Sequence, residues 1–204
     1  RRALEGLESL GLIRSEALFE SSPNTALRYV LDDPALLFWH RFVVRHRSPL
    51  ELGLTDQVWP AQIEPQLDQY MGRIFESIVR QALVRWHEAL GLAPPDTLGR
   101  WEGTDRRRRP IEVNLLVRLL DGSLLAGEIK WSTRPIGPDV HYSLVRNLED
   151  LAASGRRWAY AVNSDDTRFL YVSAAGFNAA FQSVATEDER VRLWDLTDLY
   201  PPPG

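Results

Sequence analysis

The stretch that decides the fold is residues 111–132, which reads IEVNLLVRLLDGSLLAGEIKWS. Apolar residues recur at every second position through its first ten residues, and this is the period of a β-strand. Asp121 and Gly122 follow as a dipeptide typical of tight hairpin turns. The apolar residues after the turn predict a returning strand over residues 124–132. The stretch therefore predicts an antiparallel hairpin.

Ionisable side chains would gather on one side of this hairpin. Strict alternation places Glu112 on the same face of the first strand as Asn114. Glu128 and Lys130 lie two residues apart and therefore share a face of the second strand. Mg²⁺ prefers carboxylate ligands and can generate a hydroxide that attacks a phosphodiester, so Glu112 and Glu128 are candidate metal ligands beside the Lys130 ammonium group. An ordinary cross-strand charge pair would give the same pattern.

The segments on either side of the hairpin predict a mixed α/β domain. Residues 65–90 carry apolar side chains at helical spacing, and Glu76 lies on the opposite face with Arg73 and Arg80 as neighbours. A solvated, salt-bridged helix face also explains that group. Further strands are expected at residues 158–162, 169–172 and 192–196, and further helices at residues 142–153 and 175–184.

The first 47 residues predict a separate small module. A short helix is followed by extended segments at residues 12–14 and 26–30, with a polar turn at 21–24 between them. Asp33 and Pro34 then predict the start of an aromatic helix. This order is typical of the last helix and wing of a winged-helix module, although other small α+β units share it. Proline and glycine predict a linker at 48–64, followed by a domain at 65–200 and a tail at 201–204.

Composition excludes several classes of function. The 204 residues include no cysteine, which excludes disulfides, thiolate zinc sites and cysteine nucleophiles. No apolar run approaches the roughly 20 residues of a membrane span, and a secretory leader is missing, so a cytoplasmic protein is expected. The sequence carries no Walker or dinucleotide motif, so we expect no ATP site within the chain. Because the first residue is Arg1 and the only methionine is Met71, we expect a piece of a longer polypeptide.

Several motifs resemble those of one known family. They are GRIFE at residues 72–76, RWEG at 100–103, IEVN at 111–114 and GEIKWS at 127–132. Together they look like the PD-(D/E)xK nuclease-like domain at the C-terminus of an archaeal and bacterial ATPase family. In that family a P-loop ATPase precedes a winged helix and then this domain. Residues 10–14, 33–42, 171–177 and 193–196 continue the resemblance, which covers nearly the whole chain.

The resemblance implies a fold and a set of residue roles. The fold would be a winged-helix remnant followed by a restriction-endonuclease-like mixed sheet flanked by helices. Glu76 would be the acid on the helix, and Glu112 would stand where the family usually has aspartate. Glu128 and Lys130 would form the Glu-x-Lys pair. Because glutamate carries its carboxylate about one bond length further out than aspartate, the departure at position 112 bears on catalysis more than on metal binding.

The same resemblance implies an endonuclease that hydrolyses DNA with Mg²⁺ or Mn²⁺. The expected partners are DNA and the ATPase domain of the same polypeptide, no membrane is expected, and homo-oligomerisation stays open. The expected DNA-binding residues are Arg73, Arg106, Arg107, Arg108 and Arg109. A solvated basic loop explains the four-arginine run equally well. Two other hypotheses remain: a module that binds DNA without cutting it, and a domain that regulates or oligomerises the ATPase.

Overall fold

A computed structural model describes residues 2–16, 18–19, 28–88, 91–104, 107–153, 155, 158–159 and 167–200. The chain divides into two compact units. The first comprises Arg1–Ala17 and Ser22–Ile74, and the second comprises Leu18–Ser21 and Phe75–Gly204. In the described part of the chain, none of the helices is both long enough and apolar enough to cross a bilayer.

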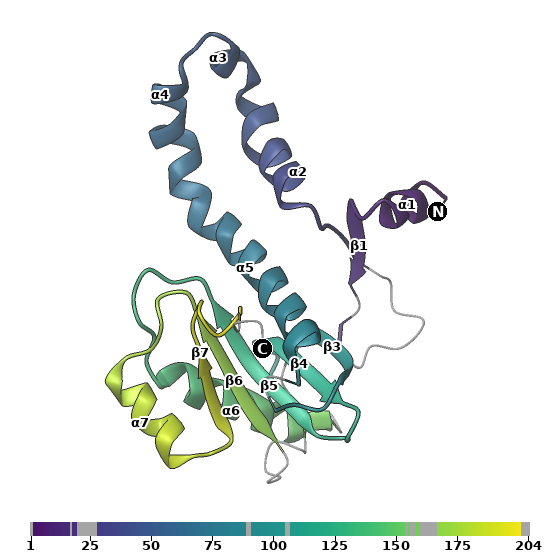
Figure 1. The fold of residues 1–204 in the computed structure, drawn as a ribbon, viewed down its shortest axis with the longest axis vertical. Coiled ribbons are helices and arrows are strands. Elements are labelled where there is room, and N and C mark those ends of the chain that lie inside the picture. The colour runs from purple at the N-terminus through teal and green to yellow at the C-terminus, as the bar shows by residue number, and fades with distance from the viewer. Residues whose placement is uncertain are drawn as a thin grey trace. The chain divides into compact units, whose positions relative to one another are not determined.

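The second unit is built on a five-stranded mixed sheet with the order β3-β4-β5-β6-β7 (Figure 1). Its strands are β3 (Pro95–Thr104), β4 (Pro110–Leu119), β5 (Leu124–Lys130), β6 (Arg168–Ser173) and β7 (Val191–Trp194). The first three are antiparallel, whereas β6 and β7 run parallel to β5. Parallel neighbours need crossover connections, and these contain the helices α6 (Asp139–Ala153) and α7 (Ala179–Glu187). The central strand β5 is therefore where the sheet changes from antiparallel to parallel.

Apolar layers cover both faces of this sheet. On one face Phe75, Val79 and Leu83, from the C-terminal half of α5 (Glu64–Trp86), share a core with Leu125. On the other face α6 and α7 share a core with alternate strand residues; its members include Leu144, Leu148, Phe181, Leu124, Ala126 and Phe169. Because side chains alternate along a strand, Glu128 and Lys130 follow Leu124 and Ala126 onto the α6 face of β5.

This architecture confirms the predicted fold class, a mixed sheet flanked by helices. The predicted hairpin is β4 and β5, and Gly122 in its turn has a φ of 87°, which glycine adopts without strain. The predicted helix at 175–184 begins later, at Ala179, because the Asn178 side chain accepts a hydrogen bond from the Phe181 N–H and caps it. The strand expected at 158–162 is not formed at residues 158 and 159, and residues 160–162 lie outside the described part of the chain.

The sequence does not predict β3, which forms one edge of the sheet. Its residues PDTLGRWEGT contain two glycines and three ionisable side chains, so no apolar alternation marks them as a strand. Only Gly99 and Trp101 are buried in this segment. The strand is held by its pairing with β4, a long-range interaction that a local pattern does not encode.

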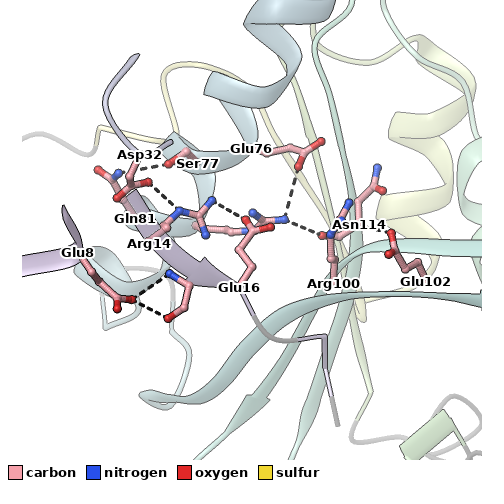
Figure 2. A network of polar contacts seen from close by, with 12 residues as sticks. Glu8, Arg14, Glu16, Asp32, Glu76, Ser77, Gln81, Arg100, Glu102 and Asn114 are labelled. Carbon is pink, nitrogen blue, oxygen red and sulfur yellow. Dashed lines mark hydrogen bonds and ion pairs between the residues drawn. The ribbon is translucent and has the colours of Figure 1, made fainter. Parts of the chain in front are cut away.

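The first unit begins with α1 (Arg2–Ser9) and the antiparallel pair β1 (Ile13–Glu16) and β2 (Arg28–Leu31). Arg14 of β1 pairs with Asp32 and with Glu16, each at 2.7 Å, and Glu8 accepts hydrogen bonds from Ser15 (Figure 2). The order of helix, strand and strand matches the predicted module. The predicted turn at 21–24 lies outside the described residues, and the winged-helix assignment stays a prediction.

A helical hairpin completes the first unit. Its first arm contains α2 (Pro34–Phe38), η1 (Trp39–Val43), η2 (Val44–His46) and α3 (Arg47–Glu51). Its second arm contains α4 (Thr55–Val58), η3 (Trp59–Ile63) and the start of α5. Phe42, Val58, Ile63 and Tyr70 form its core. As predicted, Asp33 caps α2, with its carboxylate accepting the Leu36 N–H at 2.7 Å.

The stretch 48–64, expected as a linker, is mostly helical. Pro60 lies in η3, a π-helical turn that directly follows α4, and such turns are a common place for a proline within a helical segment. The boundary between the compact units falls instead between Ile74 and Phe75, within α5.

Candidate functional site

Three polar side chains meet at the end of the hairpin strands, and we call Asn114, Glu128 and Lys130 the hairpin cluster. Oε2 of Glu128 accepts a hydrogen bond from Nδ2 of Asn114 at 2.8 Å and lies 2.9 Å from Nζ of Lys130. The Glu128 side chain is 11% exposed, whereas that of Lys130 is 43% exposed. The cluster thus presents an accessible ammonium group on a largely buried carboxylate.

Burial makes the Glu128 charge costly. Desolvation raises the pKa of Glu128, and the nearby Glu112 charge adds to this effect. The Lys130 ammonium group lowers the same pKa, but not enough to offset burial. A carboxyl group kept at such a cost is more typical of a functional site than of a stabilising ion pair.

A buried polar pair lies next to the hairpin cluster. Tyr171 of β6 pairs in register with Glu128, and its Oη lies 2.8 Å from Nδ1 of His141 on α6. Burial raises the pKa of Tyr171 and lowers the pKa of His141, so the phenol stays protonated and the imidazole stays neutral. The pair is a hydrogen bond between a phenol and a neutral imidazole ring. It joins α6 to β6, the strand that pairs with β5 at Glu128.

The helix acid Glu76 belongs to a second group of contacts. Nη2 of Arg80, one turn further along α5, lies 3.5 Å from Oε2 of Glu76 and 3.5 Å from the backbone oxygen of Asn114. Arg80 therefore links Glu76 to the strand that carries Asn114 (Figure 2). The exposed Arg73 lies in the first unit. Of the two predicted arginine neighbours of Glu76, the structure shows this contact with Arg80.

β4 contains one extra residue relative to β3. Gly99 pairs with Leu116 and Trp101 with Val113, so two steps along β3 oppose three along β4. Such a β-bulge breaks the alternation of side chains between the two faces. Val113 and Leu116 accordingly belong to the core beneath α6, whereas Leu115 belongs to the core beneath α5.

The bulge separates two side chains that strict alternation would place together. Asn114 contacts Glu128 in the hairpin cluster. Glu112 instead lies 3.5 Å from Nη1 of Arg100. Nη2 of Arg100 is 3.2 Å from Glu102, and Figure 2 shows both of these residues. Glu102 and Glu112 are directly opposite each other on β3 and β4, where two like charges would repel without Arg100. The shared face expected for Glu112 and Asn114 is therefore not formed.

The residues present do not fit a divalent metal held by two carboxylates. The Glu112 side chain is 56% exposed and faces Arg100, whereas Glu128 is engaged by Asn114 and Lys130. In the described ranges, no group of three or more His, Cys, Asp or Glu side chains could hold a metal ion. Metal sites require convergent ligands, so the metal-binding roles of Glu112 and Glu128 stay predictions.

The arginine run lies in the loop before β4, and its first member, Arg106, is outside the described residues. Arg108 has a φ of 60°. Arg109 forms an ion pair of 2.8 Å with Asp150 of α6. Arg109 and Arg146 both line a pocket of about 180 Å³ between this loop and α6. The pocket brings two cations and one carboxylate together.

Sequence reasoning missed Asn114 and Arg100 as parts of the polar site. Strict alternation places Asn114 on the hairpin face, but its uncharged amide does not mark it as a partner of Glu128, and the bulge that turns Glu112 away leaves no sign in the alternation of residues 111–120. Arg100 occurs within a quoted motif, but the sequence does not predict the strand that positions it. The β4–β5 pairing identifies Asn114, and the β3–β4 pairing identifies Arg100.

Comparison with known proteins gives a family and two distant structures. None of the curated proteins matches this chain. A repair endonuclease from Pyrococcus abyssi is similar in structure with a TM-score of 0.36 and 11% identity, and an EndoMS–dsDNA2 complex with a TM-score of 0.29 and 16% identity. Each similarity covers 57% of this chain and 44% of the other chain. Residues 39–140, half of the sequence, match the model of DUF234, so the chain belongs to this family of archaeal and bacterial proteins of unknown function.

Proposed function

We propose that the second unit is a nuclease-like domain that binds the phosphate backbone of DNA at the hairpin cluster. The observation that supports this most is the accessible Lys130 ammonium group, held 2.9 Å from a largely buried carboxylate at the end of the central strand. A buried acid raises the energy of the folded protein, so its retention beside an exposed cation suggests use rather than packing.

Further cations surround the same end of β4. Arg107, Arg108 and Arg109 precede the strand, and Arg146 shares a pocket with Arg109. Arginine and lysine contacts to phosphate oxygens position nucleic acid without reading its sequence. We therefore expect affinity for the DNA backbone with little base preference.

Hydrolysis with Mg²⁺ or Mn²⁺ is the narrower prediction from the sequence. The geometry favours binding over hydrolysis, because the predicted ligands Glu112 and Glu128 have separate partners. The winged-helix remnant, the upstream ATPase and assembly into oligomers also belong to the proposal; the first rests on the order of elements in residues 1–47 and on the resemblance, and the ATPase rests on the resemblance alone. In this proposal the DNA-binding unit directs the ATPase to its target.

The test is the affinity for a fluorescent DNA duplex, measured by anisotropy at several salt concentrations. We expect log K to fall as log[salt] rises, with a slope reduced by about 0.9 for each phosphate contact removed. Lys130→Ala should lower the slope by one such step. A triple alanine variant of Arg107, Arg108 and Arg109 should lower it by one step for each of these arginines that contacts a phosphate. Arg47→Ala, which removes an exposed arginine that pairs only locally with Glu51, is the matched control.

The outcomes separate the three hypotheses. Absence of salt-dependent affinity would overturn the proposal and support a regulatory domain. Cutting of supercoiled DNA with Mg²⁺ or Mn²⁺, abolished by EDTA and by both Glu128→Ala and Lys130→Ala, would establish hydrolysis instead. Salt-dependent affinity without cutting is the expected result.

A further inference from the structure

We infer, on the basis of the proposed function, that Asn114 occupies the position where a second carboxylate would complete a metal site, so this domain binds DNA without a divalent cation. Asn114 lies on the face of Glu128 through the regular β4–β5 register, and the bulge in β4 turns Glu112 off that face. The direct contact is the 2.8 Å hydrogen bond from Nδ2 of Asn114 to Oε2 of Glu128.

Strand register gives the same placement independently of that hydrogen bond. Leu115 pairs with Gly127, and one further step along both strands places Asn114 across from Glu128. Directly opposed residues have Cβ atoms about 4.5–5.5 Å apart, so any side chain at position 114 is an immediate neighbour of Glu128. Glu112 has a different environment, because its carboxylate lies 3.5 Å from Arg100.

The charges of the hairpin cluster already balance without a metal ion. Glu128 contributes one negative charge, Lys130 one positive charge and Asn114 none. Oε2 of Glu128 is engaged both by the Asn114 amide and by the Lys130 ammonium group at 2.9 Å. Mg²⁺ and Mn²⁺ favour carboxylate oxygens, and an amide supplies no charge to offset their dehydration.

Aspartate at position 114 would reverse this balance with almost no change in shape. The hydrogen-bond donor to Glu128 would be lost, and two adjacent carboxylates would repel each other until a cation or a proton joins them. Asn114→Asp should therefore create a metal site that the natural sequence lacks.

The experiment measures thermal unfolding of the whole chain in EDTA and in rising Mg²⁺ or Mn²⁺. We expect no metal response from the natural protein, and a rise in Tm of roughly 3 °C or more for Asn114→Asp at ten times its Kd. Gln182→Glu, the same amide-to-carboxylate change at an exposed position of α7, is the matched control and should show no response. A metal-dependent rise in the natural protein, or none in Asn114→Asp, would overturn the inference.

Two further measurements keep the result decisive. Asn114→Asp can be unstable without metal, so the natural protein is titrated first. A metal-dependent rise in its Tm that Glu112→Gln removes would assign the ligand role to Glu112 instead. DNA affinity of the natural protein is then compared in EDTA and in Mg²⁺ at matched ionic strength. Equal affinities are expected, whereas a Mg²⁺ requirement would overturn the inference. Absence of any DNA affinity would overturn the proposed function and leave the metal result standing.

Discussion

The two faces of the β4–β5 hairpin hold similar charged residues in unlike surroundings. On the α6 face, Glu128 is 11% exposed and is held by Asn114 and Lys130. On the other face, Glu112 is 56% exposed and shares Arg100 with Glu102. Both are glutamates on adjacent strands, but burial raises the pKa of Glu128. The comparison teaches that one extra residue in β4 decides which side chain joins the buried acid.

The largest expected effect comes from Gly127, which lets β5 approach β6 beneath Glu128. A Cβ atom added at Gly127 would overlap the backbone carbonyl oxygen of Leu170, which cannot move without disrupting the sheet. Gly127→Ala should cost about 3 kcal/mol of unfolding free energy or more, measured by urea denaturation. Gly6→Ala on α1, where nothing lies within 4 Å, is the control and should cost nothing. Equal stability of the natural protein and Gly127→Ala would contradict the close approach.

A smaller effect is expected at Tyr171, the register neighbour of Glu128. Tyr171→Phe removes the hydroxyl that shares a hydrogen bond with Nδ1 of His141 and leaves a buried ring nitrogen without this partner. We expect a loss of about 1–2 kcal/mol, because an unsatisfied buried polar group costs more than a solvated one. Chemical denaturation measures the loss, and Tyr142→Phe at an exposed position serves as the control. An unchanged midpoint would show that the hydrogen bond contributes nothing.

A smaller effect is expected from neutralising the two acids, Glu128 and Glu112, one at a time. Since the folded-state pKa of Glu128 is raised, its ionisation costs stability as the pH rises above the usual carboxyl range. Glu128→Gln removes that cost and should raise the stability at pH 7 by up to about 1 kcal/mol. Glu112→Gln, on the exposed face, should change it by less than about 0.5 kcal/mol. If Glu128→Gln were the less stable of the two, the comparison between the faces would be reversed.

The smallest effect on stability at neutral pH is expected from the protonation of His141, a buried residue of α6. Burial lowers its pKa from the ordinary 6.5, so the unfolded chain binds the proton more readily than the folded protein. This contribution to stability is complete above pH 6.5 and is lost as the pH falls below it, with a slope of at most about 1.4 kcal/mol per pH unit. Denaturation midpoints of the natural protein and His141→Gln between pH 7.5 and 5 isolate it from Glu128, which acts with the opposite sign. Parallel pH profiles would show that His141 does not titrate with unfolding.

The sequence predicts the parts of the fold that carry a local period. Residues 64–86 repeat apolar side chains at helical spacing, and residues 111–130 alternate around Asp121-Gly122, so the helix and the hairpin follow from the sequence. The edge strand β3 is stabilised by pairing with β4 rather than by its own pattern, and it was missed. The predicted Glu128 and Lys130 do lie together, whereas the predicted partner Glu112 is turned away by a bulge between β3 and β4. Long-range pairing, and not residue chemistry, separates what could be predicted from what could not.

The change from antiparallel to parallel pairing at β5 also has a consequence for the order in which the protein is made. The hairpin needs only the short turn at 120–123, whereas β6 reaches β5 after residues 131–167. Closing the longer connection loses more chain entropy, and a ribosome delivers the hairpin before β6 exists. Asn114, Glu128 and Lys130 are therefore all synthesised before Tyr171, the β6 residue that pairs in register with Glu128. The hairpin cluster is therefore made before the β6 residues that help to bury Glu128 and make its charge costly.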